Sequence, residues 1–374
     1  MKNTNHSFKT LFTVLVHISR IVLGAVFVFS GFVKAIDPLG YTFKIEEYLT
    51  AFGGFFEIFA PLSFLAAIAF SALELLIGLN LLFSVQLKWT GVLTLLFMLF
   101  YTPLTFYIWL ENPVTDCGCF GDALLISNGA TFAKNVVLLF FAILLLIALR
   151  GRKSFWLPRM EFAIMSVFII FGVGLQIYSY QHLPMKDFRP YKVGVNILQA
   201  MELPEGAAHD VYETTFLYEK NGVTQEFTLE NYPAGDSTWT FVDQNTKLIV
   251  KGDEPEIKGF TITDENGYEI TDLVLEYEGY NYLLSIYDLK KASIKGMQIA
   301  EKFYQEYKNT NVKFYALTSA SSDEIEEFKE KAGITFPFYQ TDATQLKTMI
   351  RANPGLVLIK NGTIEGKWNW RDFE

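Results

Sequence analysis

Two cysteines separated by one glycine, Cys117-Gly118-Cys119, are the only thiols in the chain of 374 residues. Cα atoms two residues apart are at most about 7 Å apart, near the upper limit for a disulfide. A ring this small is strained, and strained, exposed disulfides are labile and oxidising rather than structural. Cys117 and Cys119 are therefore the predicted catalytic residues. The supporting residues of their loop are Asp116, Gly118, Phe120, Gly121 and Asp122.

No second catalytic pattern stands out in the sequence. The four histidines are scattered at positions 6, 17, 182 and 209. Two cysteines alone do not complete a zinc site. No glycine-rich phosphate loop follows an expected strand, and no Gly-x-Ser-x-Gly sequence occurs. We therefore expect neither a metal site nor a hydrolase site.

Charge and hydropathy divide the chain into two unlike halves. Residues 1–160 contain 11 Lys and Arg against 8 Asp and Glu, which leaves 20 and 32 of the totals of 31 and 40 for residues 161–374. Long apolar runs dominate the first half, whereas the second half is polar with alternating strand patterns. The sequence thus predicts a membrane domain joined to an acidic soluble region. Without a basic stripe, such a region argues against nucleic acid as a partner.

Five segments are long enough to span a bilayer core, which takes about 20 helical residues. They are residues 11–33, 61–84, 89–110, 131–149 and 161–180. The more basic ends of membrane spans face the cytoplasm. One set of ends carries Lys2, Lys9, Lys88, Arg150, Arg152, Lys153 and Arg159, and the other carries Lys34, Lys44 and Lys134 among seven acidic residues.

This distribution predicts a bacterial inner (cytoplasmic) membrane protein with a cytoplasmic N-terminus. Both the cysteine loop and everything after residue 180 are then expected outside, in the periplasm or its equivalent. That compartment is oxidising, so disulfides form and persist there. The shared location of the thiols and the soluble region favours a redox function.

One face of the first span combines charges with small residues. It consists of Arg20, Gly24, Phe27, Gly31 and Lys34, at spacings of 4, 3, 4 and 3. Arg20 and Glu74 lie nine and ten residues from the inner ends of their spans, so their depths are nearly equal. A lone charge at such depth is costly, and we expect the two to pair. The pair is either a structural ion pair or the wall of a polar cavity for a quinone headgroup or another small ligand.

The same residues carry a family resemblance. The stripe on the first span, with Asp37-Pro38 and Glu74-x3-Gly78, resembles the opening of the DoxX superfamily of small membrane proteins. Cys117-Gly118-Cys119-Phe120-Gly121 and the later Lys134-Asn135 resemble its MauE branch, and the likeness covers about residues 11–150. MauE is needed to mature a disulfide-rich enzyme subunit, and DoxX relatives are associated with thiosulfate–quinone and thiol-redox complexes. The resemblance implies a thiol–disulfide role in the envelope.

Residues 185–258 are expected to form a β-rich region. Segments 212–218 and 223–229 flank Asn221-Gly222, which is a strong hairpin signal. Segments 237–242 and 247–250 suggest a second hairpin. Residues 187–191, just after the fifth span, are expected to form a plain linker or to pack against the membrane helices.

The last part of the chain alternates strands and helices and ends in a hairpin. Strands are expected at 260–263, 269–273, 282–287, 312–319, 336–339, 356–360 and 363–368, and helices at 294–308, 321–332 and 343–350. This order resembles the thioredoxin fold in its TlpA-like, membrane-tethered form. Pro354 falls where that fold keeps a cis-proline beside bound peptide. Thioredoxins place Cys-x-x-Cys where a helix N-terminus lowers the thiol pKa, but residues 288–293 contain no cysteine.

The predicted fold is an α-helical membrane bundle, with a four-helix DoxX-like core and a fifth transmembrane helix, followed by a soluble β-rich segment and an α/β thioredoxin-like domain. Its predicted divisions are residues 1–155, 156–184, 185–258 and 259–374.

The leading hypothesis is a thiol–disulfide oxidoreductase that matures envelope proteins through Cys117 and Cys119. Lys134 or Asn135, at the outer end of the fourth span, would face the loop, and a nearby lysine stabilises a thiolate. The expected partners are the lipid bilayer and an envelope thiol or disulfide protein. A quinone or another thiol protein would be the second redox partner, and no cofactor is certain. The sequence defines neither the client nor the oligomeric state.

Two other functions remain open at this point. One is a non-enzymatic, membrane-anchored scaffold or binding module that uses an inactive thioredoxin fold. The other is a small-solute transporter, because charged residues within the bundle suit one.

Overall fold

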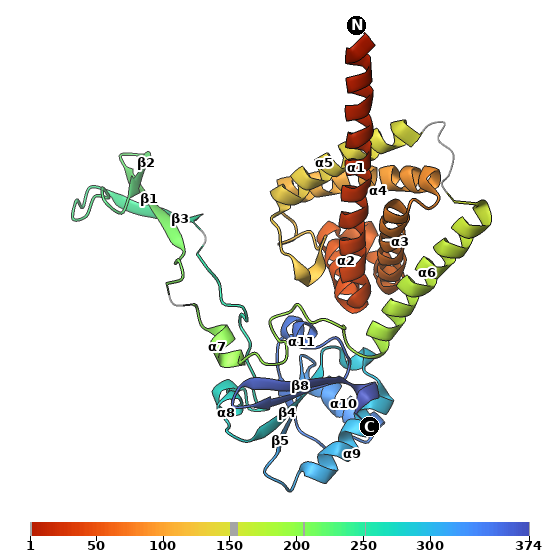
Figure 1. Ribbon diagram of the computed structural model, residues 1–374. Helices are drawn as coiled ribbons and strands as arrows, with labels where there is room; N and C mark the ends of the chain where they lie inside the picture. Colours follow the sequence, from red (N-terminus) through yellow and green to blue (C-terminus); the bar gives the residue numbers. More distant parts are fainter. Residues whose placement is uncertain (1, 150–155, 205, 251, 374) are drawn as a thin grey trace.

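The computed structural model describes residues 2–149, 156–204, 206–250 and 252–373, with side chains from residue 10 onward. The predicted boundary at residue 155 and the predicted cytoplasmic charges Arg150, Arg152 and Lys153 lie outside these residues. A helical N-terminal body, a sheet-containing C-terminal body and a long projecting arm make up the described chain (Figure 1).

The N-terminal body is helical because its apolar runs are too long for strands. Its elements are α1 (Lys2–Ile36), α2 (Pro38–Phe52), η1 (Gly54–Leu62), α3 (Ser63–Phe83), α4 (Leu87–Glu111), η2 (Gly121–Ala123), α5 (Asn128–Leu149) and α6 (Pro158–Gln181). Within the described residues, five helical stretches are long and apolar enough to cross a membrane: 10–36, 54–83, 87–111, 128–149 and 158–181. This region is therefore a set of membrane helices.

Glycines bring α1 and α3 into close contact. A Cβ atom added to Gly31 would lie 2.4 Å from the backbone nitrogen of Leu75, and one added to Gly78 would lie 2.5 Å from that of Val28. Only glycine tolerates such an approach, which explains the small residues of the stripe on the first span. The α4–α5 pair lies across α1, and the N-terminal end of α1 projects beyond the other helices (Figure 1).

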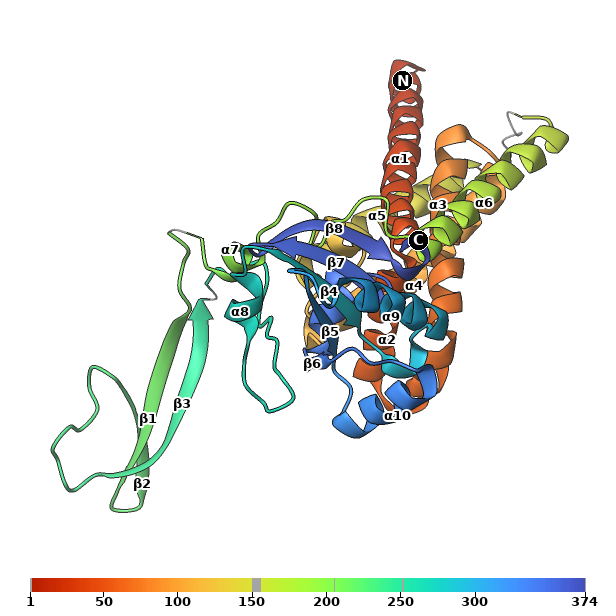
Figure 2. The same ribbon diagram turned by 90° about the horizontal axis from the view of Figure 1, so that it is seen from below.

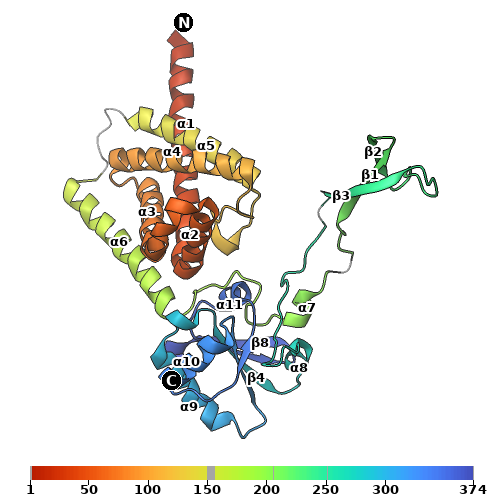
Figure 3. The same ribbon diagram turned by 180° about the vertical axis from the view of Figure 1, so that it is seen from behind.

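Helix α2 was not expected from the sequence. The carboxylate of Asp37 caps its start by accepting from the Gly40 amide, Pro38 occupies its first turn, and Gly53 ends it at φ 63°. These are the usual signals of a short helix, but they fall between the first two predicted spans, where no element was predicted. Helix α2 lies at the end of the membrane helices that faces the C-terminal body (Figure 3).

The arm is a three-stranded antiparallel sheet in the order β2-β1-β3. Its strands are β1 (Val211–Lys220), β2 (Val223–Thr228) and β3 (Thr240–Val250). The predicted hairpin at Asn221-Gly222 is present, but the second predicted hairpin is wrong, because residues 240–250 form one strand that pairs with β1. The arm extends away from both bodies (Figure 2).

The C-terminal body is built on a five-stranded sheet in the order β6-β5-β4-β7-β8. Its elements are α7 (Ile197–Met201), α8 (Thr271–Leu275), β4 (Tyr280–Ile286), η3 (Leu289–Lys291), α9 (Ile294–Tyr307), β5 (Lys313–Thr318), α10 (Ser322–Ala332), β6 (Phe338–Gln340), α11 (Ala343–Met349), β7 (Gly355–Lys360), β8 (Thr363–Asn369) and η4 (Trp370–Asp372). Strands β4, β5 and β6 are parallel, whereas β7 and β8 run antiparallel to their neighbours. The Asn353–Pro354 peptide before β7 is cis. This is a thioredoxin-like arrangement.

Residues upstream of 259 complete the core of this domain. Tyr191, Ile197 and Ile257 are fully buried in the same apolar cluster as Phe260 and Val357. The segment after α6 is thus neither a plain linker nor packed only on the membrane helices. The predicted strands at 260–263 and 269–273 reduce to a single bridge between Thr263 and Glu269, because α8 begins at Thr271.

Candidate functional site

The cysteine loop connects α4 to α5 and is shaped by two glycines. Gly118 and Gly121 have φ angles of 60° and 50°, in the left-handed region that other residues rarely adopt. The Asp116 carboxylate accepts from the Gly118 amide at 2.7 Å, which fixes the turn between the two thiols. Both cysteines are free; Cys117 is buried and Cys119 is half-buried.

The two thiols interact with each other, and this interaction changes the pKa of each. The Cys119 amide lies 3.3 Å from the Cys117 sulfur, and the Thr131 hydroxyl lies 3.4 Å from it. A hydrogen bond from the Cys119 thiol lowers the pKa of Cys117 from 9.0 to about 6, with help from Thr131 and from the charge of Lys134. The same hydrogen bond and burial raise the pKa of Cys119. Cys117 is therefore the thiolate of the pair, which is the form that exchanges disulfides.

Two lysines border the loop. Lys134 lies 4.3 Å from the centre of the Phe120 ring, and that ring packs against Phe29 at 5.3 Å. Lys44, from α2, pairs with Asp116 at 3.1 Å. Positive charge near both ends of the motif favours a thiolate over a thiol.

Side chains of the membrane helices hold the loop backbone. The Tyr48 hydroxyl donates to the Cys117 carbonyl at 2.6 Å, and the Ser30 hydroxyl donates to the Cys119 carbonyl at 2.5 Å. Asn135 instead turns into the bundle, where it donates to the Thr105 hydroxyl at 3.1 Å. Of the two residues predicted to face the loop from α5, Lys134 is thus the one that contacts it.

The predicted pairing of Arg20 with Glu74 is wrong. Glu74 pairs with Lys34 at 2.8 Å, and both side chains are buried. Arg20 donates to Ser84, ten residues further along α3, or roughly 15 Å at the helical rise. The depth estimate failed because α1 extends beyond the bundle. Arg20, nine residues into the apolar run, is therefore level with the end of α3.

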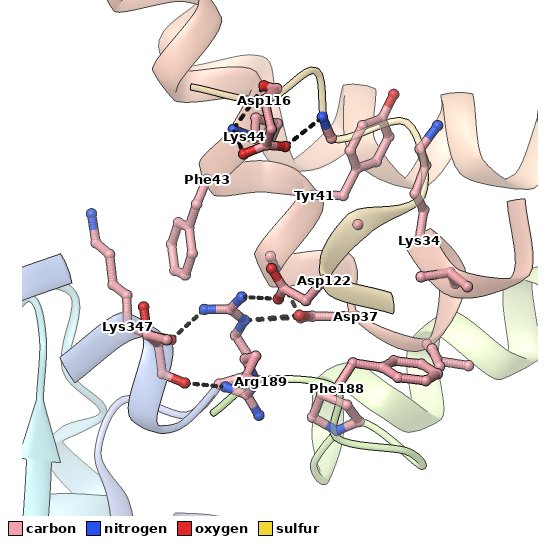
Figure 4. Close-up of a pocket in the computed structure, with 18 of the residues that line it drawn as sticks. Lys34, Asp37, Tyr41, Phe43, Lys44, Asp116, Asp122, Phe188, Arg189 and Lys347 are labelled. Carbon is pink, nitrogen blue, oxygen red and sulfur yellow. Dashed lines mark hydrogen bonds and ion pairs between the residues drawn. The ribbon is translucent and has the colours of Figure 1, made fainter. Parts of the chain in front are cut away.

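Arg351 pairs with two carboxylates across the interface between the thioredoxin-like domain and the membrane domain. Arg351 lies three residues before Pro354, and its Nε lies 2.9 Å and 3.1 Å from the two oxygens of Asp37. Its Nη2 lies 3.1 Å from Asp122, three residues after Cys119. This contact puts the cysteine loop and the thioredoxin-like domain at the same end of the membrane helices (Figure 4).

Burial and charge oppose each other in this contact. Burial would raise the pKa of Asp37, but the guanidinium of Arg351 holds it below its usual value. For Asp122 burial wins, and its pKa is raised. Arg189 adds charge from the other side: it is locked to Asp187 at 2.8 Å and donates to the Thr348 carbonyl.

Two cavities flank Arg351 at this interface. The first, about 570 Å³, lies between the cysteine loop and the thioredoxin-like domain, and its wall includes Asp116 and Gly118 on one side and Arg189 and Lys347 on the other (Figure 4). The second, about 620 Å³, reaches the segment where thioredoxins carry their cysteines. Its wall includes Tyr287, Asp288, Ser293 and Asn353.

The cis-proline face of the domain is ordered although it has no thiol. The Asn353 amide group donates to the Asp288 carbonyl at 2.6 Å, and the Ser293 amide donates to the Asn353 carbonyl at 3.1 Å. The Tyr287 ring packs edge-on against Phe43 of α2 at 5.5 Å. The face that holds peptide in a thioredoxin is thus turned toward the membrane domain.

Several residues of this site were missed at the sequence level. They are Lys34 as the partner of Glu74, Tyr48 and Thr131 around Cys117, and Asp37 with Arg351 at the interface. Asp37 carried a signal, because Asp followed by Pro is a helix start. Arg351 carried none, since its partners are more than 200 residues away.

Comparison with known proteins identifies two regions. A family model described as "Methylamine utilisation protein MauE" matches residues 12–148, a little over a third of the chain, which confirms the predicted MauE likeness. A model of a domain of unknown function (DUF8463) matches residues 212–251, the arm. No curated protein matches the chain. The chain is a membrane protein whose residues 12–148 are similar to the MauE family.

Among the solved structures similar to part of the chain is a small bacterial protein. It is described as "Solution structure of a putative protein disulfide isomerase from Bacteroides thetaiotaomicron". The match has 18% sequence identity and a TM-score of 0.26, and it covers 30% of this chain and 76% of that one.

Proposed function

We propose that this chain is a membrane-bound thiol–disulfide oxidoreductase that exchanges disulfides with envelope proteins through Cys117 and Cys119. One observation carries the proposal. A thiol pair with one acidic member stands in a loop that Arg351 joins to a thioredoxin-like domain without cysteines of its own. In a thioredoxin the thiols and the peptide-binding face belong to one domain. Here the membrane domain supplies the thiols and the thioredoxin-like domain supplies the peptide-binding face.

The proposed reaction is a two-step exchange. A thiolate of the client attacks one sulfur of the Cys117–Cys119 disulfide, and the other cysteine leaves as a thiolate. The second client thiol then attacks the mixed disulfide, so the client gains one S–S bond and the chain keeps two thiols. When the client attacks Cys119, Cys117 leaves as a thiolate that the Cys119 amide, Thr131 and Lys134 stabilise.

The thioredoxin-like domain would supply the client site. The cavity of about 570 Å³ has Asp116 and Gly118 of the cysteine loop on one wall and this domain on the other, so a client loop in it contacts both. Six basic and four acidic side chains line it, and the excess of positive charge suits acidic or neutral segments. In this reading the domain is a TlpA-like module that binds and does not react.

The charge distribution supports a periplasmic location for this chemistry. The basic span ends belong in the cytoplasm under the positive-inside rule, and the cysteine loop is at the opposite ends. We place the protein in the bacterial inner membrane, as a DoxX-type bundle with its C-terminal domain outside.

Thiol trapping in intact envelopes tests the proposal. After equilibration in redox buffers from about −300 to −100 mV, the range of known exchangers, the cysteine pair should pass from dithiol to disulfide. The C117S/C119S variant should lose all exchange with envelope proteins and retain its melting temperature. Leu125→Ala, in the same connection and 69% exposed, is the matched control and should behave as wild type. A pair that keeps one state over the whole range would refute the proposal.

A non-enzymatic scaffold is the second candidate, and the arm favours it. Strand β3 is exposed along its whole length, and the arm touches neither body, which suits a binding module. A scaffold predicts that C117S/C119S retains full activity in cells.

A further inference from the structure

A third cavity lies within the membrane domain, behind the cysteine loop. Its volume is about 220 Å³, and both Cys117 and Cys119 line it. The rest of its wall comes from α1, α2, η1, α3 and α4. This is below the roughly 300 Å³ at which drug-sized ligand pockets begin, so it has room for a headgroup rather than for a whole lipid.

The lining is apolar and aromatic except at one end. The apolar part is formed by Ile45, Leu49, Phe52, Phe56, Phe70, Phe100, Leu104 and Ile108. The polar end holds Lys34, Tyr41 and Tyr101 next to the thiols. The two tyrosine hydroxyls lie 3.3 Å apart, and the Lys34 ammonium lies 5.0 Å from the centre of the Tyr41 ring.

The other end of the cavity reaches the surface of the membrane helices. Phe56, Phe70 and Phe100 line it and are 48%, 40% and 60% exposed. Phe70 and Phe100 lie within membrane-crossing stretches, so these exposed rings meet lipid rather than water. A ligand therefore enters from the bilayer, with its polar end leading toward the thiols.

We infer that this cavity holds the ring of a lipid-soluble quinone, which oxidises Cys117 and Cys119. The inference rests on the proposed function and names its electron acceptor. Each turnover forms one S–S bond from two thiols. The two electrons and two protons released convert the quinone to its hydroquinone, so no further co-reactant is needed.

The lining fits a quinone better than an acyl chain. Lys34 is 5% exposed, and a buried ammonium with two phenols makes a set of donors for a carbonyl oxygen. An acyl chain has no oxygen that could accept from these donors and no group that could react with the thiols. Aromatic rings along the walls stack on a planar ring.

Lys34 also connects this cavity to the aqueous side. Its side chain lines both the quinone cavity and the interface cavity, and Glu74 holds it at 2.8 Å. The pair can therefore exchange protons with water while the ring remains in an apolar space. We assign Lys34 as a positioning residue for the quinone oxygen.

Quinone reduction by the full chain in lipid nanodiscs tests the inference. The reduced chain is mixed without oxygen with a short-tailed naphthoquinone or benzoquinone. We expect the loss of one quinone for each pair of thiols, followed by absorbance and by thiol trapping. An azidoquinone should label peptides of α2 or α4 that line the cavity, and it should do so in the C117S/C119S chain as well.

Matched bulky substitutions locate the site. Leu104→Trp fills the cavity, and we expect quinone reduction and azidoquinone labelling to fall about tenfold or more. Leu96→Trp is the control, because Leu96 lies on the same helix, is 57% exposed and lies outside the cavity. Both variants should keep the wild-type rate with a soluble aromatic disulfide. If Leu104→Trp does not fold, Tyr41→Phe with Tyr101→Phe should slow reduction and leave labelling intact.

Three results would overturn the inference. The first is equal quinone reduction by wild type and Leu104→Trp, and the second is labelling away from the cavity. The third is a cysteine pair that exchanges with envelope proteins but never reduces quinone; the proposed function then stands and another thiol protein is the acceptor. If the pair exchanges with neither, both proposals fail.

Discussion

The cysteine loop and the cis-proline face of the thioredoxin-like domain each hold half of a redox site. The loop has two thiols, and Cys117 is made acidic by its neighbour Cys119, by Thr131 in the first turn of α5 and by Lys134. The cis-proline face has a capped helix start at Ser293 and an ordered Asn353, but no thiol. The difference teaches that thiol activation and peptide binding are separable, and that Arg351 joins them here.

The largest expected effect comes from removing that joint. Arg351→Ala removes the cation that pairs with both Asp37 and Asp122, and breaking a pair that involves a buried arginine costs about 3 kcal/mol. Hydrogen exchange at the start of α2 and in residues 187–191 should rise accordingly. Lys290→Ala is the control, since Lys290 is exposed and its surface pair with Glu324 should contribute little to stability. Equal effects of the two variants would mean that the halves are not joined at Arg351.

The second effect concerns how Cys117 is activated. Its pKa of about 6 implies that the thiolate is present above that pH and lost below it, so alkylation should rise with pH and level off above about 7. Cys119→Ala removes the largest cause of this shift, and the rate at pH 6 should fall about tenfold. Mass spectrometry of the alkylated peptide measures both curves. An unchanged curve would assign the activation to Lys134 or Thr131 instead.

The third effect tests the shape of the loop. Gly118→Ala places a side chain at φ 60° and moves a Cβ to within 2.8 Å of Lys44, at a cost of roughly 1–2 kcal/mol. Thermal unfolding and the midpoint of the redox titration should both shift. Gly174→Ala in α6 has open space around it and should be neutral. A neutral Gly118→Ala would show that the turn does not constrain the thiols.

The smallest effect is expected from the arm. The Asp253 amide donates to the Ala208 carbonyl at 2.8 Å, so the two ends of the arm are adjacent and a short Gly–Ser linker can replace residues 211–250. The rate of exchange with a small disulfide should not change. The unfolding free energy should stay within about 0.5 kcal/mol of that of the wild type. A large loss would make the arm a third part of the redox site and end the two-part comparison.

Local signals predicted much of this molecule. Apolar runs located the membrane helices, the capping box at Ser321 and Glu324 marked α10, and Asn221-Gly222 marked the first hairpin. The failures were of another kind. Helix α2 has a start signal at Asp37-Pro38, but one Asp-Pro pair does not establish a helix by itself. The Lys34–Glu74 pair depends on the axial offset between α1 and α3, which no window of sequence encodes.

The short connection from α6 to the thioredoxin-like domain has a consequence for its attachment. The His182 carbonyl accepts from Asn369 at 2.7 Å, and its ring bonds Asp372 at 2.7 Å, so the domain is held within a few residues of the membrane surface. A tether this short gives an effective concentration in the millimolar range. An intrinsic affinity of only about 1 mM, or about 4 kcal/mol, therefore keeps the domain closed half of the time or more. Such a domain can open often to admit a client. A separate copy of the domain at micromolar concentration would bind the same surface far too weakly to replace it.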